Sequence, residues 1–171
     1  IDESNKAPRR TLEMISELLR YQLYGGNQKV SILQEIDYLK TYIALRKLRM
    51  SERLRLRVEF PPELNELNIY PLLFLPLVEN AFKYVGGDYQ LDIIMKWENN
   101  RISLFIRNSI PELSAEDEAL RKSVDERQRK GIGLVNLRRR LSLLYPNKHR
   151  LETRKEETEF VAELMIEIED I

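Results

Sequence analysis

The segment from Leu75 to Tyr84 carries side chains whose types and spacing fit a nucleotide. On a helix of about 3.6 residues per turn, one face of this segment is polar and comprises Glu79, Asn80, Lys83 and Tyr84. The opposite face is apolar and comprises Leu75, Val78, Phe82 and Val85. A carboxylate, an amide, an ammonium group and a phenol could together hold a hydrated divalent cation, a phosphate chain and a flat ring. The sequence therefore predicts a core helix with a candidate nucleotide site on its open face.

Each of these polar side chains also has an ordinary structural interpretation. Asn80 offers an amide oxygen to Mg²⁺, which takes its other ligands from water and substrate phosphates, but an asparagine can equally cap a helix. Glu79 could polarise a metal-bound water or simply face solvent. Lys83 could meet a phosphate or pair with Glu79 one turn away, and Tyr84 could stack on a base or be half-buried. The helix by itself leaves both interpretations open.

Two glycines at a loop-to-helix junction, Gly131 and Gly133, favour the functional interpretation. Glycine permits φ > 0 and a close backbone approach, which lets amide N–H groups and the helix dipole face a phosphate. The pair follows a densely charged stretch, 109–130, that lacks hydrophobic periodicity, as functional lids and disordered inserts do. A simple hinge is the structural alternative for the two glycines.

The composition limits the other classes of function. Twenty-eight basic residues balance 28 acidic ones, and the arginine clusters at 53–57 and 138–140 are typical of solvated faces, so no nucleic-acid partner is expected. The absence of cysteine excludes disulfides, a thiol nucleophile and a cysteine metal site, and it is compatible with a reducing cytoplasm. His149, the single histidine, lies in a polar turn without an adjacent carboxylate and is interpreted as a surface residue.

Two helices are expected before residue 50. Apolar residues at intervals of three and four indicate an amphipathic helix over residues 8–24, which two glycines end. Its apolar positions are Leu12, Ile15, Leu19 and Leu23. Ser31 with Gln34 and Glu35 resembles the capped start of a second helix that continues to about Met50. Its apolar stripe comprises Leu33, Ile36, Leu39, Ile43 and Leu48.

From residue 51 onward the hydrophobic period changes. Alternation over Leu54–Phe60 indicates a half-buried strand, and residues 64–69 are expected to form an irregular connection. Pro71 and Pro76 require the helix that follows either to begin late or to bend. Two hairpins are indicated, over 90–107 and 151–168, and one more helix is indicated over 131–145. The order predicts an α+β fold, a two-layer sandwich of a mostly antiparallel sheet with helices on one face.

These motifs resemble those of sensor histidine kinases of the LytS type. Leu77–Tyr84, L-V-E-N-A-F-K-Y, resembles the family's N box, and Gly131–Leu141, G-I-G-L-V-N-L-R-R-R-L, resembles its glycine box. A further likeness is to the helices that follow the family's phosphoacceptor segment. It rests on Leu18–Tyr21 and on Glu35, Tyr38, Tyr42, Leu48 and Arg49. The resemblance covers nearly the whole chain and implies the Bergerat-type ATP-binding fold shared with gyrase, Hsp90 and MutL. It implies a helical segment, 1–50, from the dimerisation and phosphoacceptor region, and a catalytic domain, 51–171, with a lid at 109–130.

The resemblance also implies roles for individual residues. Asn80 would bind Mg²⁺, Lys83 the phosphates, and Tyr84 the adenine or ribose of ATP. Glu79 would lie near the metal and its waters, as a catalytic residue together with Asn80. The positions that the glycine box would contribute to the nucleotide site are Gly131, Gly133 and Leu134.

Two features depart from the family's pattern. The phosphoacceptor histidine, in a segment like N-P-H-F-L-F-N, is absent from this sequence and would lie just before Ile1, so the fragment alone is not expected to phosphorylate itself. Asn108, in the stretch R-N-S-I-P, occupies the place of the aspartate that reads adenine. Its amide oxygen can accept from the adenine amino group, but without a charge.

The implied function is that of the ATP-binding catalytic domain of a two-component sensor histidine kinase. Such a domain transfers the γ-phosphate of ATP to an upstream histidine, for relay to a response regulator. The expected cofactors are ATP and Mg²⁺, and the expected partners are the phosphoacceptor helix, the response regulator and, in the full-length protein, a second copy. Asn108 leaves an alternative open, a degenerate nucleotide-binding module of the same fold that regulates a partner without kinase activity.

The sequence also predicts where such a domain resides. The longest nearly uncharged run, 69–78, is about half as long as a membrane helix requires. The chain opens without an initiator methionine, as a fragment of a longer protein does. Together with these features, the resemblance to sensor histidine kinases implies a cytoplasmic domain of a membrane-anchored bacterial sensor.

Overall fold

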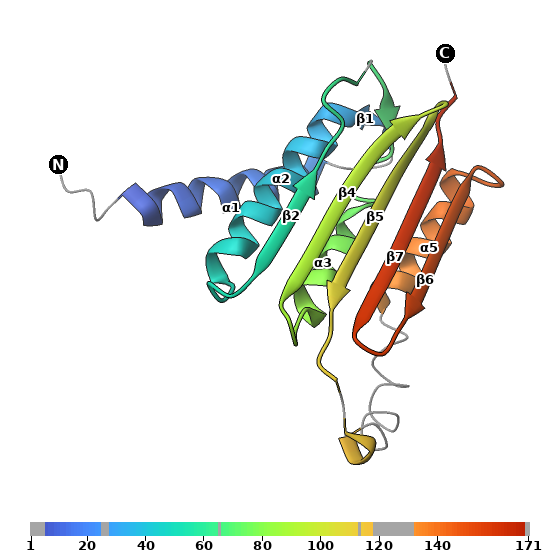
Figure 1. Cartoon of the computed structure of the whole chain (residues 1–171). Helices are drawn as coiled ribbons and strands as arrows, with labels where there is room; N and C mark the ends of the chain where they lie inside the picture. The colour runs from blue at the N-terminus through green and yellow to red at the C-terminus, as the bar shows by residue number, and fades with distance from the viewer. Residues whose placement is uncertain (1–5, 25–27, 65, 113, 118–131, 170–171) are drawn as a thin grey trace. The chain divides into compact units, whose positions relative to one another are not determined.

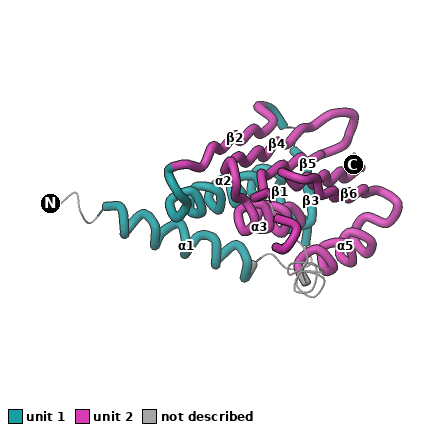
Figure 2. The backbone as a smooth tube through the Cα atoms, turned by 60° about the horizontal axis from the view of Figure 1, so that its bottom comes forward, with its two compact units in different colours: residues 1–52, 63–72 teal, residues 53–62, 73–171 magenta. Residues whose placement is uncertain are grey.

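The computed structural model describes residues 6–24, 28–64, 66–112, 114–117 and 132–169 of the 171-residue chain. The chain divides into two compact units (Figure 2). The first comprises residues 1–52 and 63–72, and the second comprises residues 53–62 and 73–171. The assignment of separate functions to 1–50 and 51–171 stays a prediction.

The first unit contains two helices and a short strand pair. Helix α1 (Lys6–Tyr24) contacts α2 (Ile32–Arg49), which begins with the predicted cap, since the Leu33 N–H donates to Ser31 Oγ at 3.3 Å. Strand β1 (Val30–Ser31) pairs antiparallel with β3 (Asn68–Ile69), where an irregular connection was predicted. Two residues are too few to show an alternating pattern, so these strands left no signal in the sequence.

The apolar stripes predicted for the two helices are only partly buried. In α2, Ile36, Leu39 and Ile43 are buried as predicted, whereas Leu33 and Leu48 are exposed. In α1 the side chains that are mainly exposed are Leu12, Leu19 and Leu23, whereas Leu18 is buried. Gln34 completes the capping box, whereas Glu35, which was also predicted to belong to the cap, is buried.

The second unit is a five-stranded sheet with helices on one face (Figure 1). The strand order is β2-β4-β5-β7-β6, with the bounds β2 Arg55–Glu59, β4 Gln90–Glu98, β5 Arg101–Ser109, β6 His149–Lys155 and β7 Glu159–Glu167. Only the β2–β4 pair is parallel. Helix α3 (Leu75–Tyr84) contacts β4, β5 and α5 (Ile132–Leu144), and α5 contacts β6. The predicted two-layer α+β sandwich is therefore confirmed.

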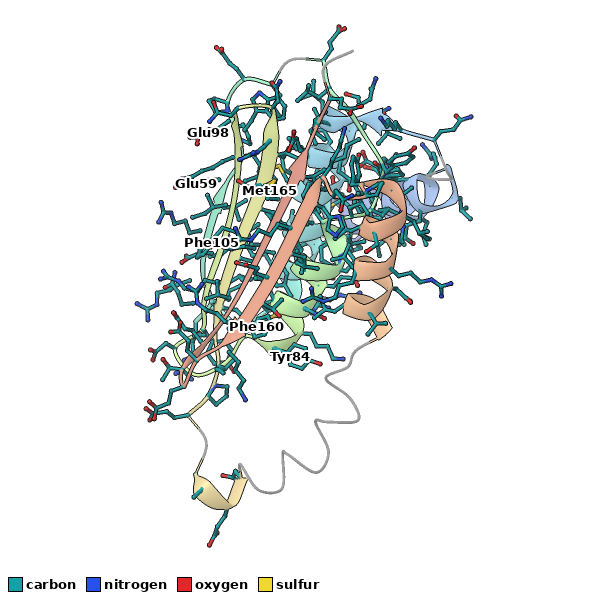
Figure 3. The ribbon with its side chains drawn as sticks, turned by 90° about the vertical axis from the view of Figure 1, so that its right-hand side faces the viewer. Glu59, Tyr84, Glu98, Phe105, Phe160 and Met165 are labelled. Carbon is teal, nitrogen blue, oxygen red and sulfur yellow. The ribbon has the colours of Figure 1, made fainter. Side chains whose placement is uncertain are left out.

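Alternation along the strands separates the core from the open face of this sheet. The core side is filled by alternate residues, among them Ile93, Ile106 and Leu164, together with Val78 and Phe82 of α3. Glu59, Phe105 and Met165 lie on the face that points away from the helices (Figure 3). In the described part of the chain, no helix is long and apolar enough to cross a membrane.

Candidate functional site

Helix α3 presents the two faces that its sequence predicts. Leu75, Val78 and Phe82 are buried, whereas Glu79 and Lys83 are exposed. The helix starts late, at Leu75, which places Pro76 in the first turn, where its missing N–H costs no helical hydrogen bond. The late start is one of the two alternatives that the prolines left open. The buried face thus fixes the helix on the sheet, and the polar face is directed toward the surface.

Asn80 lies in the middle of α3 and is half-buried. The position before the helix is occupied by Phe74 and the position after it by Val85, so Asn80 caps neither end. Within the described residues, its amide takes part in no hydrogen bond. The capping interpretation of Asn80 is therefore wrong, and its amide oxygen remains suited to a hard cation.

Lys83 and Tyr84 lie together at the C-terminal end of α3. The Lys83 Nζ atom lies 5.2 Å from the centroid of the Tyr84 ring, which is half-buried. This separation is within the range of a cation–π interaction. The ammonium group and the aromatic ring that the sequence singled out thus occupy one small region of the surface.

The loop after Tyr84 is fastened to the end of β5. The Gly86 N–H donates to the Ser109 carbonyl oxygen at 2.9 Å, and Ser109 Oγ donates to the Gly86 carbonyl oxygen at 2.7 Å. Gly87 has φ +60°, and a Cβ there would lie 2.8 Å from the Ile110 carbonyl oxygen, so the close approach requires glycine. These contacts hold the end of α3 against the end of the strand that carries Asn108.

Asn108 is almost completely buried, with 1% of its surface exposed. Its Nδ2 atom donates to the Ser109 carbonyl oxygen at 3.4 Å, which is a weak hydrogen bond. With the amide nitrogen directed to the main chain, the amide oxygen is the group that can accept from an amino group. The predicted role as an acceptor for adenine is therefore compatible with the orientation of this side chain.

Phe160 is a candidate residue that the sequence did not reveal. It pairs across the sheet with Asn108, is half-buried, and lies at the same end of the unit as Tyr84 (Figure 3). In the sequence it is one aromatic residue within an apolar strand, which is typical of a core position. Only the register of β5 against β7 identifies it as the neighbour of Asn108.

The start of α5 lies at this end of the sheet as well (Figure 1). Gly133 and Leu134 fall in its first turn, exposed and half-buried respectively. Gly133 does not use the left-handed backbone that glycine permits, and a Cβ there would meet nothing within 4 Å among the described residues. Packing therefore does not require this glycine, whereas an open helix N-terminus suits a phosphate.

Part of the predicted glycine box and lid lies outside the described residues. This applies to Leu113, to residues 118–130 and to Gly131. In the described part of the predicted lid, residues 115–117 form a helical turn, and the Asp117 N–H donates to Ser114 Oγ at 3.3 Å.

The donor set suits a magnesium ion that a nucleotide brings with it. Among the described residues, no group of three histidine, aspartate or glutamate side chains could hold a metal ion. Asn80 supplies one neutral oxygen, and Mg²⁺ typically completes its six ligands with water and substrate phosphates. The residues therefore fit a Mg²⁺–nucleotide complex better than a resident metal ion.

His149 belongs to a different end of the second unit. Its Nδ1 atom lies 2.7 Å from the Tyr145 carbonyl oxygen, just after α5, and it begins β6. It is half-buried rather than a plain surface residue as predicted, and its contact supports the turn between α5 and β6. The geometry gives it a structural role.

Comparisons with known proteins relate this chain to histidine kinases. Residues 1–54 match the sequence family described as histidine kinase. The sensor protein kinase HptS of Staphylococcus aureus is 27% identical over 153 residues, which cover 86% of this chain and 30% of HptS. The chain thus spans about a third of the length of the curated relatives that it matches.

Solved structures share the fold at low sequence identity. The catalytic domain of the histidine kinase ThkA has a TM-score of 0.52 and 17% identity, and the match covers 82% of this chain and 96% of that domain. Full-length ShkA, solved in complex with AMPPNP, has a TM-score of 0.54 and 14% identity, covering 97% of this chain and 37% of ShkA. The fold is therefore that of histidine kinase catalytic domains, the Bergerat-type or GHKL fold that the sequence resemblance implied.

Proposed function

We propose that this chain binds Mg²⁺-ATP and acts as the catalytic part of a two-component sensor histidine kinase of the LytS type. The observation that carries the proposal is the convergence of three elements at one end of the sheet. Asn80, Lys83 and Tyr84 lie in the C-terminal half of α3, Asn108 is the residue before the last of β5, and Gly133 lies in the first turn of α5. The AMPPNP of the ShkA structure, a nucleoside triphosphate analogue, supports the same ligand class.

In this proposal each group has one task in binding ATP. Asn80 contributes an oxygen to Mg²⁺, which when bound neutralises phosphate charge. Lys83 and the N-terminal turn of α5 face the phosphates, while Tyr84 and Asn108 contact the adenosine. Glu79, exposed beside Asn80, orders water near the metal. The chain's residues thereby hold and orient the triphosphate.

The reaction is phosphoryl transfer to an imidazole nitrogen. The nitrogen attacks the γ-phosphorus, the bond from that phosphorus to the bridging oxygen breaks, and ADP leaves with the electron pair. A neutral imidazole needs no protein base to become a nucleophile, so positioning and charge neutralisation supply the catalysis. We propose that the acceptor histidine lies upstream of Ile1 in a longer protein and that a response regulator then takes the phosphoryl group.

A phosphotransfer assay tests this function. The chain is mixed with γ-labelled ATP, Mg²⁺ and a separate fragment that carries the histidine upstream of Ile1. Label on that fragment is expected with the wild-type chain and not with the Asn80→Ala variant. ATP binding without any label on the histidine would contradict the kinase function and leave nucleotide binding intact.

The second candidate is a nucleotide-binding regulatory module without kinase activity. The uncharged Asn108 at the adenine position favours it, because a neutral acceptor binds an amino group more weakly than a carboxylate does. This candidate predicts Mg²⁺-ATP binding and no phosphotransfer. The Asn108→Asp variant separates the two, since a weakened kinase should gain both affinity and transfer rate from the restored charge.

The wider context of the domain is part of the same proposal. The exposed side chains of α1, Leu12, Leu19 and Leu23, support dimerisation through this helix in the full-length protein. We further propose that residues 1–50 belong to the dimerisation and phosphoacceptor region, that residues 51–171 form the catalytic domain with a lid at 109–130, and that the full-length protein is a membrane-anchored sensor with this part in the cytoplasm.

A further inference from the structure

A buried carboxylate in the first unit joins three segments that are distant in sequence. Glu35 of α2 is completely buried, with 0% of its surface exposed. Its Oε2 atom accepts from the Tyr21 hydroxyl of α1 at 2.5 Å, and its Oε1 atom accepts from the Leu72 N–H at 2.8 Å. A carboxylate removed from water requires such bonds, and charge makes them stronger than neutral ones.

The Glu35 Oε1 atom, by accepting from the Leu72 N–H, stabilises a turn whose backbone conformation is unusual. Leu72 has φ +61°, a left-handed conformation that residues with a side chain seldom adopt. Such a conformation persists where the surrounding structure fixes it. The stretch before this turn is fixed as well, because the Ile32 N–H donates to the Leu67 carbonyl oxygen at 2.8 Å and β3 pairs with β1.

This turn leads directly into the helix that carries the candidate nucleotide site. Leu73 and Phe74 follow Leu72 in the chain, and both are completely buried. Helix α3 begins at Leu75, and no side chain caps its N-terminus. Without a cap, the start of α3 depends on the path of the preceding chain, so the Leu72 turn helps to set where α3 begins.

Helix α1 supplies the second hydrogen-bond donor to Glu35, the Tyr21 hydroxyl. The Tyr21 ring stacks on the Tyr38 ring of α2, with centroids 4.6 Å apart and planes at 29°. The Gln22 Nε2 atom donates to the Tyr38 hydroxyl at 3.0 Å. The Tyr21 hydroxyl is thereby held on Glu35, and the position of α1 along α2 determines whether the carboxylate keeps this donor.

We infer that Glu35 is a positioning residue for the nucleotide site: its carboxylate fixes the Leu72 turn from which α3 begins, and Tyr21 of α1 holds that carboxylate in place. A change in the packing of α1 on α2 that withdraws Tyr21 would loosen the Leu72 turn and thus the start of α3. The effect on the nucleotide rests on the proposed function, whereas the effect on Leu72 does not.

Variants at Glu35 separate this role from simple packing. Glu35→Leu fills the space but removes the acceptor, whereas Glu35→Gln keeps an amide oxygen for the Leu72 N–H. The exchange rate of the Leu72 amide is measured by NMR on the labelled 171-residue chain, and the Kd for Mg²⁺-ATP is measured by calorimetry. For Glu35→Leu, we expect amide exchange at least about tenfold faster and a Kd about five- to tenfold higher.

The conservative variants and a control complete the test. Glu35→Gln should stay within about twofold of wild type in both measurements, and Tyr21→Phe should raise both by about threefold. Asp37→Asn, on the exposed side of α2, is the matched control and should change neither. The amides of Leu104 and Ile106 in the sheet core report on unfolding of the second unit, and their exchange should rise less than that of Leu72.

Several outcomes would overturn the inference. It fails if Leu72 exchanges at the wild-type rate in Glu35→Leu and Tyr21→Phe, or if exchange rises while the Kd does not change. If Glu35→Leu does not fold, Tyr21→Phe against Glu35→Gln still decides it. If the wild-type chain binds no nucleotide, the proposed function is refuted, and with it the inferred role of Glu35 in nucleotide binding. The exchange rate of the Leu72 amide still tests whether Glu35 fixes the turn.

Discussion

The two units of the molecule use polar side chains in opposite ways. Around the buried Glu35 in the first unit, carboxylate, hydroxyl, amide and backbone N–H groups satisfy one another in a partly buried cluster. On the polar face of α3 in the second unit, Asn80 and Lys83 reach the surface, and the described contact of Lys83 is with its neighbour Tyr84. A closed cluster stabilises and positions the fold, whereas an open one can bind a ligand.

The sharpest contrast between the two clusters is expected in stability. Glu35→Ala should lower the free energy of unfolding by about 3 kcal/mol, because it leaves two partly buried donors without their acceptor and opens a cavity. Asn80→Ala should change it by no more than about 0.5 kcal/mol, since alanine is a better helix former and the side chain is half-buried. Urea denaturation followed by circular dichroism measures both values. Equal losses would remove the distinction between the clusters.

Two glycines of the second unit should differ in the same way, in how strongly their replacement by alanine changes the free energy of unfolding. Gly87→Ala should cost about 2 kcal/mol, because the new Cβ would collide with the Ile110 carbonyl oxygen in a left-handed backbone. Gly133→Ala should instead stabilise the chain by about 0.5 kcal/mol, since the position is helical and open.

The effect of Gly133→Ala on nucleotide binding should be opposite to its effect on stability. Gly133→Ala should weaken Mg²⁺-ATP binding despite its greater stability, because a methyl group there blocks the helix N-terminus. Thermal melting and calorimetry on the same samples give both quantities. A stabilised Gly133→Ala variant with wild-type affinity would exclude Gly133 from the site.

The smallest expected effect is a pH dependence that originates in the closed cluster. Burial, followed by the hydrogen bond to Glu35, raises the pKa of Tyr21 well above its usual range. A raised pKa in the folded state gives stability that is fully present below the pKa of an unfolded tyrosine, about 10, and that is lost as the pH rises above it. Wild type should therefore lose stability above about pH 10 more steeply than Tyr21→Phe does. Identical slopes in denaturation measured from pH 9 to about 11 would contradict this origin.

The sequence predicted those parts of the fold whose pattern is long and local. The alternation around Leu56 and the apolar run around Ile93 indicated strands, and the helical spacing of Val78 and Phe82 indicated the buried face of α3. Pro76 left a late start of α3 or a bend open, and the structure has the late start. The apolar stripe of α1 did not predict burial, because periodicity identifies an apolar face but not what covers it. Leu19 and Leu23 are exposed in this chain.

The parts that escaped prediction depend on contacts between distant residues. Phe160 becomes a neighbour of Asn108 only through the register of β5 and β7. Glu35 resembled a cap residue because it lies next to Gln34, and only the approach of Leu72 and Tyr21 shows why a carboxylate is buried there. The polar residues of α3 were found in advance because a single helix brings them together.

Nucleotide binding itself is measured by calorimetric titration of the chain with ATP in the presence of Mg²⁺. We expect saturable heat with the wild-type chain, and heat that is lost or shifted to at least about tenfold weaker binding in Asn80→Ala, which should fold normally. No heat with the wild-type chain at millimolar ATP, or equal affinities for wild type and Asn80→Ala, would contradict the claim that the end of α3 binds a nucleotide.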